Sequence, residues 1–214
     1  MTVWLTEGEH RTLTALHDRL VPGDGVSPGA GDAGGADYVD QLLAAFTFDP
    51  PRIWAGGPFS GRHGGQPGFE RWLELGAVEE LAWRTRVEGS QGRPERELNG
   101  PVVGWQEQYR RGLASLGDDF AQVPAGEQDR RIALAPAGFV ELAFTHACES
   151  LYGDPVYGGN RDGSGWAAIG FAGDVQPRGW TDAEVTGAVV PKTSGVSGDA
   201  APPPHFPKSF RGKG

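Results

Sequence analysis

The segment DPVYGGNRDGSGWAAIGF, residues 154–171, combines clustered glycines with charged side chains and three aromatic residues. Tyr157, Trp166 and Phe171 are large apolar surfaces that gain free energy by burial, which is not typical of a solvated linker. A core helix would not tolerate so many glycines, because each costs about 1 kcal/mol relative to Ala. We therefore predict an ordered loop, with glycines at special backbone angles and the aromatics packed against this chain or a second protein.

Composition restricts the classes of protein to which the chain can belong. Its 214 residues can form one large domain with a sizeable core, and its 35 Gly and 17 Pro favour long irregular loops around that core. The net charge of −9 makes nucleic acids and anionic membranes poor partners. The single cysteine, Cys148, excludes an internal disulfide and a cysteine-based metal site. No run of about 18 apolar residues is present that could span a bilayer.

Apolar residues recur at helical spacing in several stretches before the glycine-rich segment. Thr6 and Glu9 match a capping box, and Pro124 and Pro136 are predicted to open two later helices. Residues 86–100 are polar and are predicted to form a surface loop. The periodic residues of the earlier helices are Leu13, Leu16 and Leu20; Tyr38, Val39, Leu42, Leu43 and Phe46; Phe69, Trp72, Leu75, Val78 and Leu81, interrupted near Gly76; and Val102, Trp105, Tyr109, Leu113, Leu116 and Phe120.

The helix that follows Pro136 carries apolar residues around much of its circumference. One face holds His146, which we interpret as a packed, hydrogen-bonded core histidine, because no orienting base or oxyanion donor accompanies it. Phe144, Cys148 and Leu151 lie beside that face. We therefore expect this helix to be buried on most sides.

The predicted fold class is mainly α. No stretch alternates between apolar and polar residues with a period of two, so little sheet is expected. Residues 1–185 are predicted to form a single helical domain of five to seven helices with long Gly/Pro-rich loops. Residues 186–214 are rich in Pro, Gly, Ser and Ala and are predicted to be an extended C-terminal tail that wraps a partner or is disordered.

Motifs for cofactor and metal chemistry are incomplete throughout the chain. Residues 163–168 read GSGWAA and formally fit a dinucleotide-binding turn, but the polar residues before them cannot form the buried strand that this motif requires. Asn160, Asp162 and Gly163 occupy three positions of an EF-hand register whose two strongest ligands are missing. The five histidines lack metal-binding spacing. We therefore assign no catalytic, cofactor-binding or metal-binding residue.

Residues 154–166, continued by Ile169-Gly170-Phe171, resemble the signature of the gluconate 2-dehydrogenase subunit 3 family. The resemblance extends upstream through the helix that bears His146 and Glu149, and to the N-terminal pattern Leu13-x-x-Leu16-x-x-Arg19-Leu20-Val21-Pro22. It covers roughly residues 5–180. It implies a small, mainly helical, non-catalytic subunit whose usual partner is a large FAD-binding oxidoreductase of the glucose–methanol–choline class that oxidises gluconate, glucose or related sugars. Some such complexes add a cytochrome subunit.

On this interpretation the chain stabilises the large subunit and assists its maturation through an extensive permanent interface, and FAD lies entirely in the partner. The alternatives are a transient chaperone for the flavoprotein, and a free-standing carbohydrate-active enzyme that uses carboxylates near residues 149–162. The residues that we expect at the partner interface are Trp54, Phe59, Asp154, Tyr157, Asn160, Arg161, Asp162, Trp166 and Phe171.

Many family members begin with a twin-arginine export signal. Met1–Glu7 lacks a basic region and an apolar stretch, so we expect a cytoplasmic location, with export alongside a partner as the alternative.

Overall fold

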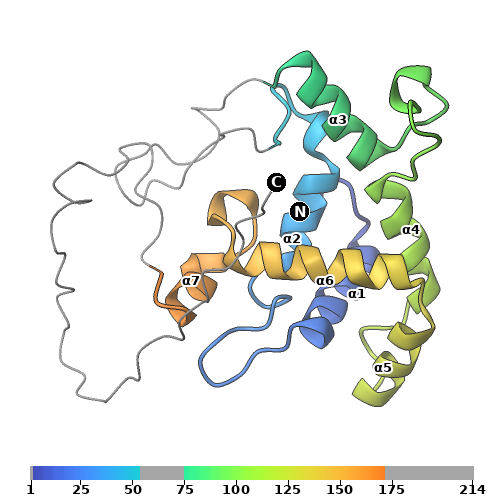
Figure 1. The fold of residues 1–214 in the computed structure, drawn as a ribbon. Helices are drawn as coiled ribbons and strands as arrows, with labels where there is room; N and C mark the ends of the chain where they lie inside the picture. The colour runs from blue at the N-terminus through green and yellow to red at the C-terminus, as the bar shows by residue number, and fades with distance from the viewer. Residues whose placement is uncertain (1, 54–74, 172–214) are drawn as a thin grey trace, which may run out of the picture. The chain divides into compact units, whose positions relative to one another are not determined.

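The computed structural model describes residues 2–53 and 75–171, and it is mainly helical as predicted (Figure 1). The described residues contain seven α-helices and no strand, within the predicted range. The α-helices are α1 (Glu7–Leu20), α2 (Gly35–Leu43), α3 (Ala77–Glu88), α4 (Trp105–Leu116), α5 (Ala125–Leu134), α6 (Ala137–Tyr152) and α7 (Ser164–Ala168). Short 3₁₀ helices are η1 (Ala45–Thr47), η3 (Pro94–Arg96), η4 (Pro155–Tyr157) and η5 (Arg161–Gly163).

The first helix begins where its capping box predicts. The Thr6 hydroxyl accepts the backbone N–H of Glu9 at 3.2 Å, and the Glu9 carboxylate accepts the backbone N–H of Thr6 at 2.8 Å. These two bonds satisfy N–H groups that lack partners at a helix start. Pro124 and Pro136 each stand one residue before their helices, as N-caps, and not at the first helical position.

The main core lies where α1, α2, α4 and α6 meet. The four helices contribute Leu13, Val39, Tyr109 and Ala143, each of which is fully buried. Phe120 follows α4 and is also fully buried. Figure 1 shows α6 running across α1 and α2. These contacts hold the C-terminal half of the described chain against its N-terminal half.

Asp40 on α2 holds the N-terminal segment against this core. Its carboxylate accepts three consecutive backbone N–H groups, from Val3 at 2.6 Å, Trp4 at 2.9 Å and Leu5 at 2.7 Å. Asp40 is buried, and a buried carboxylate is tolerated when several donors satisfy it. The sequence pattern of α2 gave no sign of this role.

One expectation for the middle of the chain is wrong and another holds only in part. Val78 was placed on an inward helical face, but α3 begins at Ala77 and Val78 is 81% exposed. Residues 86–100 are not simply a surface loop, because α3 continues to Glu88 and Val87 is fully buried. Arg96 is also buried, and it donates to the Glu88 carboxylate and to the Gly89 carbonyl, each at 3.0 Å. Charge pairing therefore buries residues that polarity alone assigns to the surface.

The last long helix is also less buried than expected. Leu151 is buried, but Phe144 is 48% exposed and Cys148 is half-buried, so one side of α6 is open. The predictions for Trp54, Phe59, Phe69, Trp72 and the tail 186–214 lie outside the described residues. None of the helices in the described ranges combines the length and apolarity that crossing a bilayer requires.

Candidate functional site

The glycine-rich segment is an ordered structure, as predicted. It consists of η4, η5 and α7, joined by residues in the left-handed region of backbone space. Gly158 and Gly163 have φ values of +98° and +67°, which cost glycine little. Asn160 and Asp162 have φ values of +47° and +57° in the same region, where Asn and Asp are the most tolerated other residues. The short helix α7 was not predicted, because glycine content alone argued against a helix.

Asn160 is the internal anchor of the segment. Its side chain is fully buried, and its Oδ1 accepts the backbone N–H of Gly165 at 2.9 Å. Its Nδ2 donates to the Gly153 carbonyl at 2.8 Å. One side chain thus ties the end of α6 to the start of α7. An amide is needed here, because the site requires a donor and an acceptor on the same group.

Trp166 packs the segment onto the end of α6. It is 3% exposed, and its indole Nε1 donates to the Tyr152 carbonyl at 2.7 Å. Its ring also meets the ring of Phe171 edge to face, with centroids 5.2 Å apart. Phe171 itself is 41% exposed. The predicted burial of aromatics against this chain therefore holds for Trp166, while Phe171 keeps an open surface.

Arg161 joins the segment to α1 and α2. Its guanidinium donates to Asp37 Oδ2 at 3.0 Å and to the Asp32 carbonyl at 3.1 Å. The other oxygen of Asp37 lies 2.8 Å from Nε2 of His10 on α1. The backbone N–H of Arg161 donates to the Ala33 carbonyl at 2.9 Å. This network fixes the position of the segment by charge-assisted bonds.

The remaining polar residues of the segment differ in exposure. Asp154 caps η4 by accepting the backbone N–H of Val156 at 3.0 Å. The phenol of Tyr157 is half-buried, and desolvation followed by the nearby Asp154 raises its pKa. Asp162 is exposed. Seven of the nine predicted interface residues lie in this segment, but Asn160 and Trp166 are buried within the chain and present no surface to a partner. The other two, Trp54 and Phe59, lie outside the described residues.

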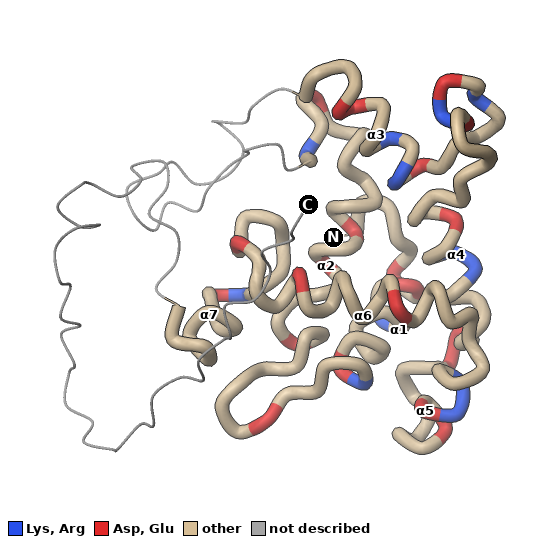
Figure 2. Tube along the Cα trace, in the orientation of Figure 1, with Lys and Arg blue, Asp and Glu red and all other residues tan. Residues whose placement is uncertain are grey.

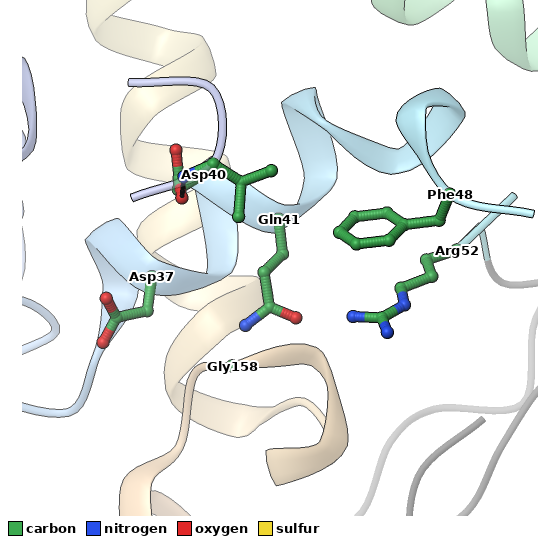
Figure 3. A pocket seen from close by; sticks show the side chains of 7 residues that line it. Asp37, Asp40, Gln41, Phe48, Arg52 and Gly158 are labelled. Atoms are coloured by element: carbon green, nitrogen blue, oxygen red, sulfur yellow. Dashed lines mark hydrogen bonds between the residues drawn. The ribbon is translucent and has the colours of Figure 1, made fainter. Parts of the chain in front are cut away.

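A cavity of about 450 Å³ lies beside the segment, between it and α2 (Figure 3). The side chains of Gln41, Phe48 and Arg52 converge above Gly158, and Asp37 lies on the other side. A Cβ at Gly158 would overlap the Gln41 amide, which would have to shift, and the φ of +98° independently favours glycine here. The lining is mostly polar and Asp40 is bound to backbone N–H groups, which is unlike the mainly apolar lining of small-molecule sites.

His146 lies in a buried aromatic cluster and not in a cleft. Its Nδ1 is 2.9 Å from the Tyr109 hydroxyl, which confirms the prediction of a hydrogen-bonded core histidine. Desolvation lowers the pKa of His146 to about 4. Burial and the neighbouring His146 lower the pKa of His17 to about 3, and no hydrogen-bond partner among the described residues reaches either nitrogen of the His17 ring. Both imidazoles are therefore neutral near pH 7.

Two of the carboxylates of the alternative enzymatic interpretation have structural partners. Glu149 accepts the Tyr38 hydroxyl at 3.0 Å, and Asp154 caps η4. No group of three or more potential metal ligands occurs in the parts of the chain that the structure describes.

The structure also reveals surface residues that sequence reasoning missed. Phe144, Tyr152 and Ile169 are 48%, 43% and 58% exposed. Phe144 and Tyr152 are separated by two helical turns, with Cys148 between them, a spacing that places all three along one side of α6. That spacing is visible in the sequence, but Phe144 and Cys148 were expected to be buried because the opposite side of α6 is also apolar, and Tyr152 was not assigned to a face.

A family model described as gluconate 2-dehydrogenase subunit 3 matches residues 7–173. No curated protein and no solved structure matches the chain. The match includes α1, the whole glycine-rich segment and all the helices between them, in agreement with the resemblance seen in the sequence.

Proposed function

The chain belongs to the gluconate 2-dehydrogenase subunit 3 family, and we propose that it is the non-catalytic small subunit of an FAD-dependent sugar oxidoreductase. Membership in a subunit family implies a hetero-oligomeric complex with other dehydrogenase subunits. We further propose that the main partner is a large flavoprotein of the glucose–methanol–choline class. In this proposal the partner holds the FAD and performs the chemistry, and the small subunit stabilises it and assists its maturation.

The observation that supports this role is that several polar side chains of the glycine-rich segment bind other groups of this chain. Asn160, Arg161 and Asp154 bind backbone or side-chain groups of this chain. Trp166 likewise donates its indole proton to a carbonyl of α6. These bonds hold the segment in a fixed conformation. None of them joins a nucleophilic side chain to a general base. Rigid preorganised surfaces reduce the entropic cost of association, which suits a permanent subunit.

The proposal is tested by the flavin content of the partner. The large subunit would be produced with and without this chain, and FAD would be released by denaturation and measured by absorbance. We expect low FAD occupancy and low dehydrogenase activity without the small subunit, with no change in the flavin spectrum of the fraction that folds. Equal FAD occupancy and activity in both preparations would contradict the maturation role.

The same preparations separate the two alternatives. A permanent subunit stays with the flavoprotein at constant stoichiometry through purification in about 1 M salt, whereas a transient chaperone is lost once the flavoprotein is loaded. Turnover of a sugar by the isolated chain, abolished by Asp162→Asn, would instead establish the carbohydrate-active enzyme.

A further inference from the structure

One side of α6 and the end of α7 present a row of apolar side chains to solvent. Three of its members, Phe144, Tyr152 and Ile169, have exposed fractions of 48%, 43% and 58%, and Phe171 is 41% exposed. Single exposed apolar residues are common on protein surfaces, but a contiguous group marks an interaction site. The group, which we name the apolar strip, consists of Phe144, Cys148, Tyr152, Ile169 and Phe171.

The contacts described above connect Phe171 to the end of α6, and Ile169 lies two residues before Phe171. Phe144, Cys148 and Tyr152 lie four residues apart along α6, so about 12 Å of helix separates the first from the last. The Tyr152 carbonyl accepts the Trp166 indole, and the Trp166 ring contacts Phe171. Trp166 therefore acts as the buried floor that joins the α6 part of the strip to the part after α7.

Acidic side chains border the strip. Glu141 and Glu149 lie on α6 and Asp162 lies in η5, and all three are exposed. Figure 2 shows acidic positions along α6 and in the loop between α6 and α7. Arg161 is the basic residue nearest in sequence to Asp162, and its guanidinium is bound to Asp37. The border is therefore net negative.

We propose that the apolar strip is the surface on which the catalytic subunit docks, and that the subunit meets it with an apolar groove bordered by Arg and Lys. This proposal rests on the proposed function, because it takes the catalytic subunit as the occupant. An apolar centre with a polar border is typical of stable interfaces, and opposite charges at the border favour the correct partner. A second copy of this chain fits poorly, because a symmetric contact would bring two acidic borders together.

The single cysteine provides a native reporter of this contact. Cys148 lies in the strip and is half-buried, and burial followed by the nearby Glu149 raises the pKa of its thiol. The rate of its alkylation by N-ethylmaleimide would be measured at about pH 8.5 in the purified complex and in the isolated chain. We expect at least a tenfold slower reaction in the complex. Equal rates in the two samples would overturn the docking assignment.

Substitutions test the strip without disturbing the core. Ile169→Asp and Phe144→Asp each place a charge on an exposed position, so folding should persist, as circular dichroism would check. We expect each to weaken binding of the catalytic subunit at least tenfold. Val78→Asp on α3 is the matched control, because Val78 is 81% exposed and lies outside the strip. Unchanged affinity in both strip variants would overturn the proposal.

The charge of the partner's border is tested by association kinetics. We expect Glu141→Arg to slow association severalfold and to reduce its dependence on salt, whereas Glu95→Arg, the same charge change in η3, should have a much smaller effect. Faster association of the Glu141→Arg variant would overturn the proposal that Arg and Lys border the groove of the partner.

These outcomes are distinct from failure of the proposed function. A flavoprotein that binds normally while Cys148 stays reactive would refute the strip alone. A purified chain that forms only homodimers with protected Cys148 would refute both.

Discussion

Gly112 on α4 lies directly against the ring of Phe139 on α6, so that a Cβ at this position would overlap the ring atoms. Phe139 is 3% exposed and its ring also meets Tyr109 edge to face, with centroids 5.7 Å apart, so it has little room to move. Glycine is therefore required here for packing, although glycine normally weakens a helix interior.

This contact predicts a reversal of the usual effect of replacing glycine by alanine. Gly112→Ala should lower the free energy of unfolding by about 2 kcal/mol or more, because overpacking outweighs the gain in helix propensity. Gly126→Ala in α5 is the matched control, since nothing lies within 4 Å of a Cβ there, and it should stabilise by about 0.5 kcal/mol. Urea denaturation of both variants measures the difference. A stabilised Gly112→Ala protein would show that α4 and α6 are farther apart than described.

Asn160 carries a second prediction, about the order of the glycine-rich segment. Asn160→Ala removes bonds to Gly153 and Gly165, leaves buried backbone groups unsatisfied, and places alanine at a φ of +47°. We expect a loss of about 2–4 kcal/mol in unfolding free energy, or local release of the segment, seen as faster amide exchange over residues 160–171.

The control for Asn160 lies two residues away. Asp162 has a similar φ of +57° but an exposed side chain, so Asp162→Gly keeps the backbone geometry and removes no buried bond. Its stability should stay within about 1 kcal/mol of the parent protein. Equal losses of stability in the two variants would mean that the Asn160 hydrogen bonds do not decide the stability of the segment.

The helical periodicities predicted most of the fold because they report burial on one face. Leu13, Tyr109 and Leu113 were assigned correctly for this reason. Val78 was not, because it was assigned to the same face as the residues before Gly76, where an interruption was predicted and where the structure places the N-cap of α3. Arg96 was assigned to the surface because a sequence does not show that Glu88 will be within 3.0 Å of it after folding.

The sequence predicted where the candidate site lies along the chain, but it did not predict which side chains of the site are exposed. The glycines and aromatics of residues 154–171 indicate an ordered loop, and the structure contains one. They do not show which aromatic faces inward, since burial of Trp166 depends on its bond to the Tyr152 carbonyl on another helix. Phe144 was expected to be buried because α6 is apolar on several sides, and only the packing of neighbouring helices shows which side stays open.

A third prediction concerns the N-terminal segment. Asp40→Asn keeps the size of the side chain but leaves one acceptor oxygen for the three backbone N–H groups of Val3, Trp4 and Leu5. We expect a loss of about 2 kcal/mol and faster amide exchange at these three residues. Asp24→Asn is the control, because the exposed Asp24 accepts two local N–H groups in a loop. Unchanged exchange at residues 3–5 would contradict the anchoring role of Asp40.

The last prediction is a loss of stability in mild acid, caused by two buried histidines. The pKa values of His17 and His146 in the folded chain are about 3 and about 4, below the ordinary value of 6.5. At pH values between these folded-state pKa values and 6.5, the unfolded chain binds more protons than the folded chain. The neutral histidines therefore contribute their full share to the free energy of unfolding above about pH 6.5. As the pH falls below this value, the free energy of unfolding declines by up to about 1.4 kcal/mol per pH unit for each histidine.

His17→Leu separates histidine protonation from carboxylate titration, because the carboxylates titrate in the parent protein and in the variant alike. Tyr38 on α2 and Tyr109 on α4 contact His146, and the substitution leaves them in place. Within residues 2–53 and 75–171 no hydrogen-bond partner reaches the His17 ring, so His17→Leu should be at least as stable as the parent at pH 7.5. Its advantage should grow by about 2 kcal/mol between pH 6.5 and pH 5, measured by urea denaturation. A constant difference across this range would show that His17 is not buried in its neutral form.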